Sequence, residues 1–381
     1  YLCMLHSKIP HGYVKAVHAE KALALPGVYG VYHCLNTTDR KYNRYRSNFD
    51  QAYLPNEECA FNDYVRFVGD KIGVVAACDQ ETAERAARLV EVEYEELPFS
   101  IGFDDTLAGK NCLEGETPVR DEYTLEVGKK QESTEGLIEV CSTMELPRLH
   151  HATMETHACI ADYDPYIDML TVYCPNQAVH GIRTVLADYL EMPESHVRVI
   201  KATMGGSFGA KQEWFLEPVA ALVAKKLCCP VKLVYSRGEA MTDTIVRGAM
   251  RMSARGYYTP DGEMKEIYCD VTLDAGAYIG NAGDYIRALA GKPTRCYRIP
   301  YMHYHGQVIS SNSPVSGAFR SWSAAEEALM MERQIDAAAE KLGIDRLTIR
   351  LKNVAHAGEE DKKLHLSLED IRIGDAITLG S

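Results

Sequence analysis

The sequence predicts an α+β protein of two or three domains. Its 381 residues exceed the length of one typical domain. Hydrophobic residues make up 46% and charged residues 25% of the chain, which is the balance of an ordinary globular protein and excludes a disordered or collagen-like chain. Strand-like runs and helical patterns both occur along the chain, and together they predict mixed sheets with packed helices.

The first hundred residues contain signals for strands and for a helix. Residues 65–78 are rich in β-branched and small side chains around Gly69–Asp70, which predicts two strand segments joined by a turn. Asp79 is expected to cap a helix over residues 80–89. Residues 91–97 alternate glutamates with Val92 and Tyr94, which predicts a further strand.

The segment 106–135 is polar and rich in Gly, Asp, Glu and Lys, and this composition predicts a linker. The chain is therefore expected to divide into a first domain over residues 1–105, this linker, and a second domain over residues 136–381.

The second domain is expected to alternate strands with three clear helices. The helices are predicted at residues 177–190, at residues 216–227, and from Ser323 to Gly343. Ser323 and Glu326 have the spacing of a capping box, and Gly343 suits the position after the last helical residue. Strands are expected at residues 139–145, 158–163, 168–173, 197–201, 231–235 and 266–273.

Charge, hydropathy and cysteine usage exclude several classes of protein. The formal net charge is −13, which makes the chain a poor general binder of nucleic acid or anionic membrane. Its apolar runs are far shorter than the roughly 20 residues that span a bilayer. The 12 cysteines include no CxxC pair and no zinc or iron–sulfur spacing, so we expect reduced, buried thiols in a cytoplasmic protein.

A glycine-rich turn, GGSFGAKQ over residues 205–212, lies between a predicted strand and a predicted helix. Backbone N–H groups converge at such a place, and the helix terminus favours an anion. The turn fails the P-loop pattern because Lys211 follows Ala210, and it also fails the dinucleotide pattern. A plain tight connection is the alternative interpretation.

A second loop, GAFRSWS over residues 317–323, precedes the last long helix. Arg320 could hold a phosphate or a polar cofactor edge, and Trp322 could stack on a planar ligand. Equally, Phe319 and Trp322 could anchor the loop in the core while Arg320 pairs with an acid.

The segment LHHATMETH, residues 149–157, concentrates histidines around a carboxylate. His151, Glu155 and His157 suggest a metal site, but their order matches no known zinc motif and the segment leads straight into a strand. Structural histidines are the favoured interpretation.

Five motifs in this order resemble the molybdenum-binding subunit of the xanthine dehydrogenase and aldehyde oxidase family, over nearly the whole chain. They are GGSFGAK at residues 205–211, AFRSWS at 318–323, METH at 154–157, LDAGAY at 273–278, and DRLTIRLKN at 345–353. The resemblance implies an α/β hammerhead domain over residues 1–105 and the first half of a molybdopterin-binding domain over residues 136–381.

The resemblance also implies a function. The chain would be a component of a molybdenum hydroxylase that uses water to hydroxylate a purine, a related nitrogen heterocycle or an aldehyde. It implies a molybdenum–molybdopterin cofactor, in its plain or its cytosine dinucleotide form, and electron transfer to [2Fe-2S] and FAD groups on partner chains or domains. The implied partners are a C-terminal molybdopterin-binding half or subunit, an iron–sulfur subunit and an FAD subunit. The alternative is a non-catalytic scaffold or relic that keeps the fold without cofactor.

The family motifs assign roles to individual residues by position. Cofactor-binding roles fall on Gly206, Ser207, Phe208, Gly209, Phe319 and Arg320. Substrate-binding roles fall on Gln212, Arg287, Trp322 and Leu149. No direct metal ligand is implied. The catalytic glutamate of the family would lie beyond Ser381, so the chain by itself is expected to be inactive. Ser207, Ala210 and Ser321 replace glycines of the family.

Overall fold

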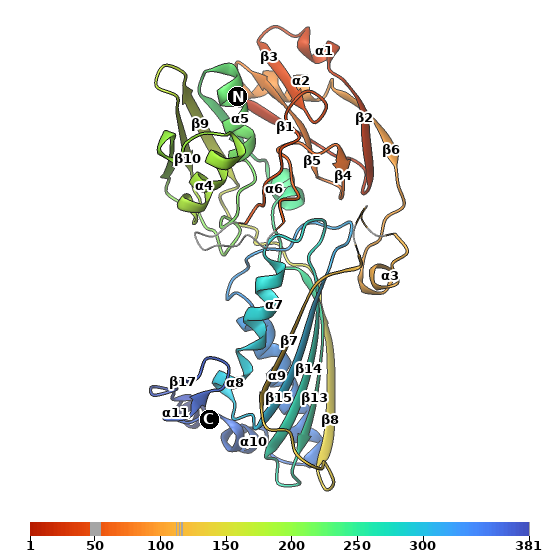
Figure 1. The fold of residues 1–381 in the computed structure, drawn as a ribbon, viewed down its shortest axis with the longest axis vertical. Helices are drawn as coiled ribbons and strands as arrows, with labels where there is room; N and C mark the ends of the chain where they lie inside the picture. The colour runs from red at the N-terminus through yellow and green to blue at the C-terminus, as the bar shows by residue number, and fades with distance from the viewer. Residues whose placement is uncertain (46–54, 112, 114, 116, 381) are drawn as a thin grey trace.

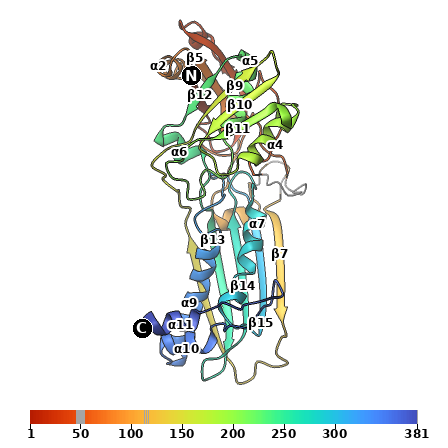
Figure 2. The ribbon, with the colours of Figure 1, turned by 90° about the vertical axis from the view of Figure 1, so that its left-hand side faces the viewer.

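The computed structural model describes residues 1–45, 55–111, 113, 115 and 117–380. The chain forms an upper and a lower lobe, with a waist of loops between them (Figure 1). The N-terminus lies in the upper lobe and the C-terminus in the lower lobe, and the same division is visible after a quarter turn (Figure 2). The mixed sheets and packed helices confirm the predicted α+β class.

The upper lobe is built on one seven-stranded mixed sheet with the order β11-β10-β9-β12-β1-β5-β3. β1 runs parallel to β12, which joins strands from the first 77 residues to strands from residues 158–234. One sheet therefore contains strands from both predicted domains, whose boundaries stay a prediction. The strands are β1 (Leu2–His6), β3 (Val28–His33), β5 (Lys71–Ala77), β9 (Ala158–Asp164), β10 (Met169–Cys174), β11 (Val197–Lys201) and β12 (Val231–Val234).

Helices cover this sheet because each has an apolar face or is apolar all round. α5 (Glu217–Leu227) is buried from Glu217 to Ala224 and packs on β9. α4 (Val179–Tyr189) packs on β11, and α2 (Gln80–Ala87) packs on β5. The other upper-lobe elements are α1 (Glu20–Leu23), the 3-10 turn Glu194–His196, α6 (Arg237–Asp243), and a three-stranded sheet of β4 (Tyr64–Val65), β2 (Gly12–His18) and β6 (Glu91–Glu96).

The lower lobe is a five-stranded sheet with the order β7-β15-β14-β13-β8, and α7 (Ala282–Ala290) and α9 (Ala324–Leu342) pack against it. Met252, Ile267, Tyr304 and Ile335 belong to the core between them. The strands are β7 (Val119–Gly128), β8 (Ile138–Leu146), β13 (Ala249–Tyr258), β14 (Met264–Asp274) and β15 (Tyr301–Ile309). The remaining elements are α3 (Phe103–Leu107), α8 (Pro293–Cys296), α10 (Arg346–Asn353), β16 (Glu360–Asp361), β17 (Leu366–Ser367) and α11 (Ile373–Gly380).

Two local predictions differ from the structure. The segment 106–135, expected as a linker, contains strand β7, which pairs with β15 along its length. In this mostly polar strand, Leu125 and Val127 alternate with exposed side chains and pack against the core. The capping box at Ser323 is also wrong, because Ser323 has a φ of 65° and makes no capping hydrogen bond. Gly343 ends α9 with a φ of 65°, as predicted.

In the described residues, no helix combines the length and the apolar character needed to cross a membrane.

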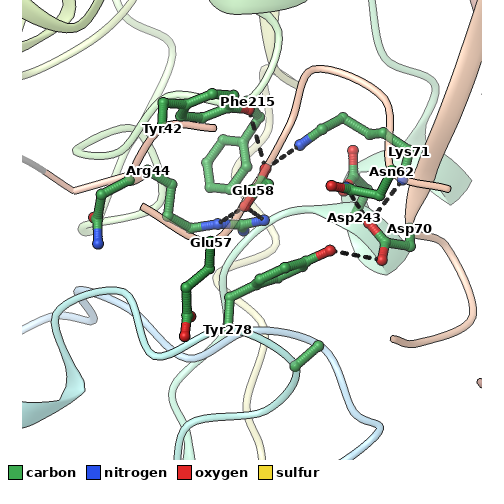
Figure 3. Close-up of polar contacts among 12 residues, drawn as sticks. Tyr42, Arg44, Glu57, Glu58, Asn62, Asp70, Lys71, Phe215, Asp243 and Tyr278 are labelled. Atoms are coloured by element: carbon green, nitrogen blue, oxygen red, sulfur yellow. Dashed lines mark hydrogen bonds and ion pairs between the residues drawn. The ribbon is translucent and has the colours of Figure 1, made fainter. Parts of the chain in front are cut away.

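A buried ion cluster, consisting of Tyr42, Arg44, Glu58 and Lys71, lies in the upper lobe next to the waist (Figure 3). The Arg44 Nε atom donates to Glu58 Oε2 at 2.7 Å, and Lys71 Nζ donates to Glu58 Oε1 at 2.5 Å. The Tyr42 hydroxyl also donates to Glu58, at 3.1 Å. All four residues are at most 2% exposed. Burial alone would raise the pKa of Glu58, but Arg44 and Lys71 outweigh it and hold the pKa below its ordinary value.

Asp70 extends this network to the loops of the waist. It accepts hydrogen bonds from the Asn62 amide at 2.9 Å and from the Tyr278 hydroxyl at 2.8 Å (Figure 3). Tyr278 lies in the loop after β14, which belongs to the lower lobe. The Arg66 guanidinium also donates to the Ala277 carbonyl, at 3.2 Å. Arg66 and Asp70 thereby fix this part of the upper lobe to the loops between the lobes.

Replacing the shared carboxylate should destabilise the whole chain. We expect Glu58→Gln to lower the free energy of unfolding by about 3–5 kcal/mol, because two buried cations then lose the carboxylate to which both are hydrogen-bonded. Glu95→Gln is the matched control, since the Lys15–Glu95 ion pair is more than half exposed and should contribute less than about 1 kcal/mol. Urea unfolding measures both changes. Equal small losses would show that the buried ion cluster does not stabilise the fold.

Candidate functional site

Two loops meet at the waist. The glycine turn, residues 205–212, connects β11 with α5, and the arginine loop, residues 317–323, precedes α9. They touch so closely that a Cβ atom on Gly209 would lie 2.4 Å from the Ala318 carbonyl oxygen. Gly209 also has a φ of 103°, which disfavours any other residue there. Two motifs that are about 110 residues apart in the sequence therefore form one surface.

The histidine-containing segment lies beneath both loops. The Nε2 atom of His157 is 3.0 Å from the Ala210 carbonyl oxygen, and that of His151 is 2.7 Å from the Ala318 carbonyl oxygen. Burial lowers the pKa of both imidazoles to about 4, so each is neutral at pH 7 and donates to its carbonyl through Nε2. These contacts agree with the interpretation of structural histidines. Within the described residues, no three metal-ligating side chains are placed to hold a metal ion.

Glu155 and Ser207 fix the conformation of the glycine turn itself. Glu155 accepts a hydrogen bond from the Gly205 N–H at 3.0 Å and forms an ion pair with the buried Lys211. Partial burial raises the pKa of Glu155, but these two donors outweigh it and the pKa lies below its ordinary value. The Ser207 hydroxyl donates to the Gln177 side chain and accepts from the Lys211 N–H at 3.2 Å. The serine that replaces a family glycine is therefore part of the turn's support.

The two loops present a run of backbone donors without acceptors. In the part of the chain that the structure describes, the N–H groups of residues 206–209 and of residues 319–321 donate to no other residue. Gly206, Phe208 and Gly209 have φ values of 99°, 54° and 103°. Successive N–H groups in turns with left-handed residues form concave sites for anions and other acceptors. The Phe208 side chain is 51% exposed, and Arg320 is exposed as well.

The arginine loop is held in an unfavourable backbone conformation. Ser321, Trp322 and Ser323 have φ values of 80°, 45° and 65°, and each left-handed residue of this kind costs about 1–2 kcal/mol. The Lys292 ammonium donates to the Trp322 carbonyl and, at 2.5 Å, to the Ser323 hydroxyl. The Trp322 ring stacks on Tyr45 with a centroid distance of 6.4 Å. These contacts offset the strain and keep the loop against the glycine turn.

Most of the residues to which the family motifs assign a role lie on the two loops or next to them. Every residue with an implied cofactor role lies on one of the two loops, as do Gln212 and Trp322. Leu149 pairs through its backbone with Arg247, whose guanidinium lies 4.9 Å from the centre of the Phe319 ring. Arg287 does not join them. Its guanidinium makes two hydrogen bonds to Asp121 of β7, at 2.6 and 2.9 Å.

Glu213 is a buried carboxyl group at this site that sequence reasoning missed. Its Oε1 atom accepts a hydrogen bond from the Asn281 amide at 3.0 Å, while Oε2 has no partner within the described structure. Burial raises the pKa of Glu213 to about 8, although the Arg44 guanidinium and the Ala318 N–H lower it. No sequence signal marks this residue, because a glutamate just before a helix is common at helix N-termini.

A cleft of about 990 Å³ lies elsewhere, in the upper lobe, and is lined by residues of β1, α2, β6 and β12. Several of its charged side chains already have partners, such as Glu84 with Arg88 and Glu91 with Lys21. It does not coincide with the two loops that carry the family motifs.

Comparison with known proteins identifies the family. The model of the molybdopterin cofactor-binding domain matches residues 116–354. The model of the aldehyde oxidase and xanthine dehydrogenase a/b hammerhead domain matches residues 1–98. The chain belongs to the xanthine dehydrogenase and aldehyde oxidase family of molybdenum hydroxylases.

Individual members of this family resemble the chain over most of its length. The xanthine dehydrogenase molybdenum-binding subunit of Escherichia coli O157:H7 is 30% identical over 377 residues, which cover 94% of this chain and 48% of that protein. The nicotinate dehydrogenase large molybdopterin subunit of Eubacterium barkeri is 30% identical over 362 residues, which cover 94% of this chain and 83% of that protein. The chain thus spans about half the length of the first relative and most of the second.

Solved structures confirm the fold. The aldehyde oxidoreductase of Desulfovibrio gigas superimposes with a TM-score of 0.90 at 24% identity, over 99% of this chain and 42% of that one. The quinoline 2-oxidoreductase of Pseudomonas putida 86 gives a TM-score of 0.86 at 23% identity, over 99% of this chain and 49% of that one. This molybdenum hydroxylase chain therefore has the hammerhead and molybdopterin-binding folds that its motifs imply.

The contact between the loops should not tolerate a side chain at Gly209. We expect Gly209→Ala to lower the free energy of unfolding by about 1–3 kcal/mol more than Gly206→Ala does, because only the Cβ atom at residue 209 overlaps the backbone of the other loop. Both glycines have left-handed backbones, but the nearest atom to a Cβ at Gly206 is 3.4 Å away. Thermal or urea unfolding of the two variants measures the difference. Equal costs would show that the loops do not touch as described.

The buried carboxyl group should make stability depend on pH. The folded chain keeps the Glu213 proton up to a pKa of about 8, whereas the unfolded chain loses it near the ordinary value of 4.5. The folded state therefore holds more protons between these values, and the free energy of unfolding falls as pH rises. Arg44 and Glu58 are the charged groups that act on Glu213.

Urea unfolding of the natural chain and of Glu213→Gln at several pH values tests this. The stability of the natural chain relative to the variant should fall between about pH 5 and 8 and stay level above. A difference that does not change with pH would contradict the assignment.

Proposed function

We propose that the chain is the part of a molybdenum hydroxylase that holds one side of the molybdenum cofactor. The whole enzyme would use water to hydroxylate a purine, a related nitrogen heterocycle or an aldehyde. The observation that carries this proposal is the run of unpaired N–H groups on two touching loops, at the positions of the family's cofactor motifs.

The donor set of the site fits this cofactor. Molybdopterin carries a phosphate and the metal carries oxygen ligands, so all of these are hydrogen-bond acceptors. The site offers the N–H groups of residues 206–209, those of residues 319–321, and the exposed Arg320 guanidinium. Guanidinium groups and preorganised N–H groups are the donors that hold such acceptors in proteins. The bound cofactor would supply the two-electron redox chemistry of the hydroxylation.

The chain's own residues would bind and orient. Phe208 and Gly209 would donate backbone N–H groups to the acceptor atoms nearest the metal, and Arg320 would hold a charged edge of the cofactor or substrate. His151 and His157 keep the carbonyls of Ala318 and Ala210 turned inward. The N–H groups of the loops are thereby left free for ligands rather than for internal hydrogen bonds.

A planar nitrogen heterocycle is the substrate class that we favour. Gln212 on the glycine turn provides an amide that can donate and accept at ring nitrogens and carbonyls, and Trp322 on the arginine loop provides an aromatic surface. Tyr45 stacks on Trp322 and Tyr285 packs against it at 5.1 Å in a T-shaped arrangement, so a substrate would meet only the part of the ring that these two residues leave open. Arg287 is not included in the proposed substrate site, because its guanidinium is hydrogen-bonded to Asp121. The relative from Eubacterium barkeri is named for nicotinate, which is such a heterocycle.

The proposed enzyme is an assembly. A C-terminal molybdopterin-binding half or subunit would close the other side of the cofactor and supply the catalytic glutamate. Iron–sulfur and FAD subunits or domains would accept the electrons, and the cofactor would be the plain or the cytosine dinucleotide form. We place the assembly in the cytoplasm. The alternative is a scaffold without cofactor, and in that case side chains of the protein itself would fill the space around the two loops. The exposure of Phe208 and Arg320 supports the enzyme instead.

Metal analysis and turnover of the native complex test the proposal. We expect about one molybdenum atom per chain and hydroxylation of at least one of xanthine, hypoxanthine or nicotinate, assayed with an artificial electron acceptor. Turnover of aldehydes alone would exclude the nitrogen heterocycle. A native complex that contains no molybdenum would contradict the proposal and favour the scaffold.

A further inference from the structure

Glu213 lies where three parts of the waist meet. It follows the glycine turn directly, and its backbone carbonyl accepts a hydrogen bond from the Asn176 amide at 2.8 Å. Its carboxyl group extends to Asn281, the residue before α7, at 3.0 Å. The same carboxyl oxygen would lie 2.4 Å from a Cβ atom on Gly317, at the start of the arginine loop. The side chain is completely buried.

The peptide around Ala318 is held from several sides. Its carbonyl oxygen is bound by His151 and touches Gly209. Its N–H lies close enough to the Glu213 carboxyl group to lower the pKa of that group. The Glu213 carboxyl group thus lies between the glycine turn and the arginine loop, where Asn281 donates to it and Gly317 packs against it.

We propose that Glu213 is a positioning residue that sets the spacing between the glycine turn and the arginine loop, and thereby the cradle for the cofactor. The inference deepens the proposed function and rests on it for the identity of the ligand. Glu213 touches no substrate or cofactor, and it acts through Ala318 and Asn281.

Hydrogen-bond acceptance is the property that the position requires. Its Oε1 atom faces donors, and a glutamine carbonyl has the same reach and can accept the same bonds. Aspartate keeps the carboxyl group but is one methylene shorter, so its oxygen is drawn back from Asn281 and the arginine loop. Leucine keeps most of the volume and removes the acceptor, which leaves the Asn281 amide without this partner.

The test uses the native complex with Glu213→Leu, Glu213→Asp and Glu213→Gln. Glu217→Gln is the control, because Glu217 is also buried and begins α5, but its carboxyl accepts from the Phe215 N–H at 3.1 Å. Two quantities are measured: amide hydrogen exchange of residues 317, 318 and 322, which are hydrogen-bonded or buried, and molybdenum per chain. Glu213→Asp keeps the test valid where Glu213→Leu does not fold.

We expect exchange at residues 317, 318 and 322 to accelerate about tenfold or more in Glu213→Leu, and by about threefold or more in Glu213→Asp. Molybdenum content should fall in the same order. Glu213→Gln and Glu217→Gln should stay within about twofold of the natural protein in both quantities.

Natural exchange rates in Glu213→Leu and Glu213→Asp would overturn the inference. A loss in Glu213→Gln equal to that in Glu213→Leu would also overturn it, because charge or packing would then explain the effect. Failure of the proposed function gives a different result, in which the natural complex lacks molybdenum while the exchange rates still separate the variants.

Discussion

The buried ion cluster of Tyr42, Arg44, Glu58 and Lys71 is the constraint on which the waist of this protein depends. Two cations share one carboxylate inside the fold, and such a group is tolerated only where its charges and hydrogen bonds are satisfied together. The Arg44 guanidinium also lies 4.9 Å from the centre of the Phe215 ring, close behind the glycine turn, and 5.5 Å from that of Tyr278. The cluster therefore fixes the loops of both lobes to the first strands of the chain.

The candidate site follows from this arrangement. Glu213 lies within the electrostatic reach of Arg44 and connects the cluster to the two loops. His151 and His157 hold loop carbonyls from the other side, and Lys292 holds the strained end of the arginine loop. These side chains bind carbonyl oxygens of the loops, so those carbonyls do not pair with the N–H groups of residues 206–209. The N–H groups therefore remain available. A rigid support with unpaired donors at its surface is the usual form of a preorganised binding site.

Much of the fold could be predicted from the sequence, and the reasons for the failures are physical. The helices at residues 177–190 and 216–227 have strong apolar periodicity, and the structure forms both within a few residues. Strand β7 was missed because its outward side is polar and its inward residues, apart from Val127, are only half-buried. The two loops could be singled out from their motifs, but the contact of Gly209 with Ala318 could not, since it depends on how the lobes pack. Glu213, Asn281 and Lys292 carry no motif, because their roles arise only from the tertiary structure.

The membership of the chain in the molybdenum hydroxylases and the geometry of its loops lead to one central claim, that the unpaired N–H groups of the glycine turn face a molybdenum cofactor. Anomalous diffraction at the molybdenum absorption edge, on crystals of the native complex, tests this claim most directly. The account predicts a molybdenum peak beside the N–H groups of Phe208 and Gly209, on the side of the site that Arg320 faces. A complex without such a peak, or with molybdenum bound away from these loops, would contradict it.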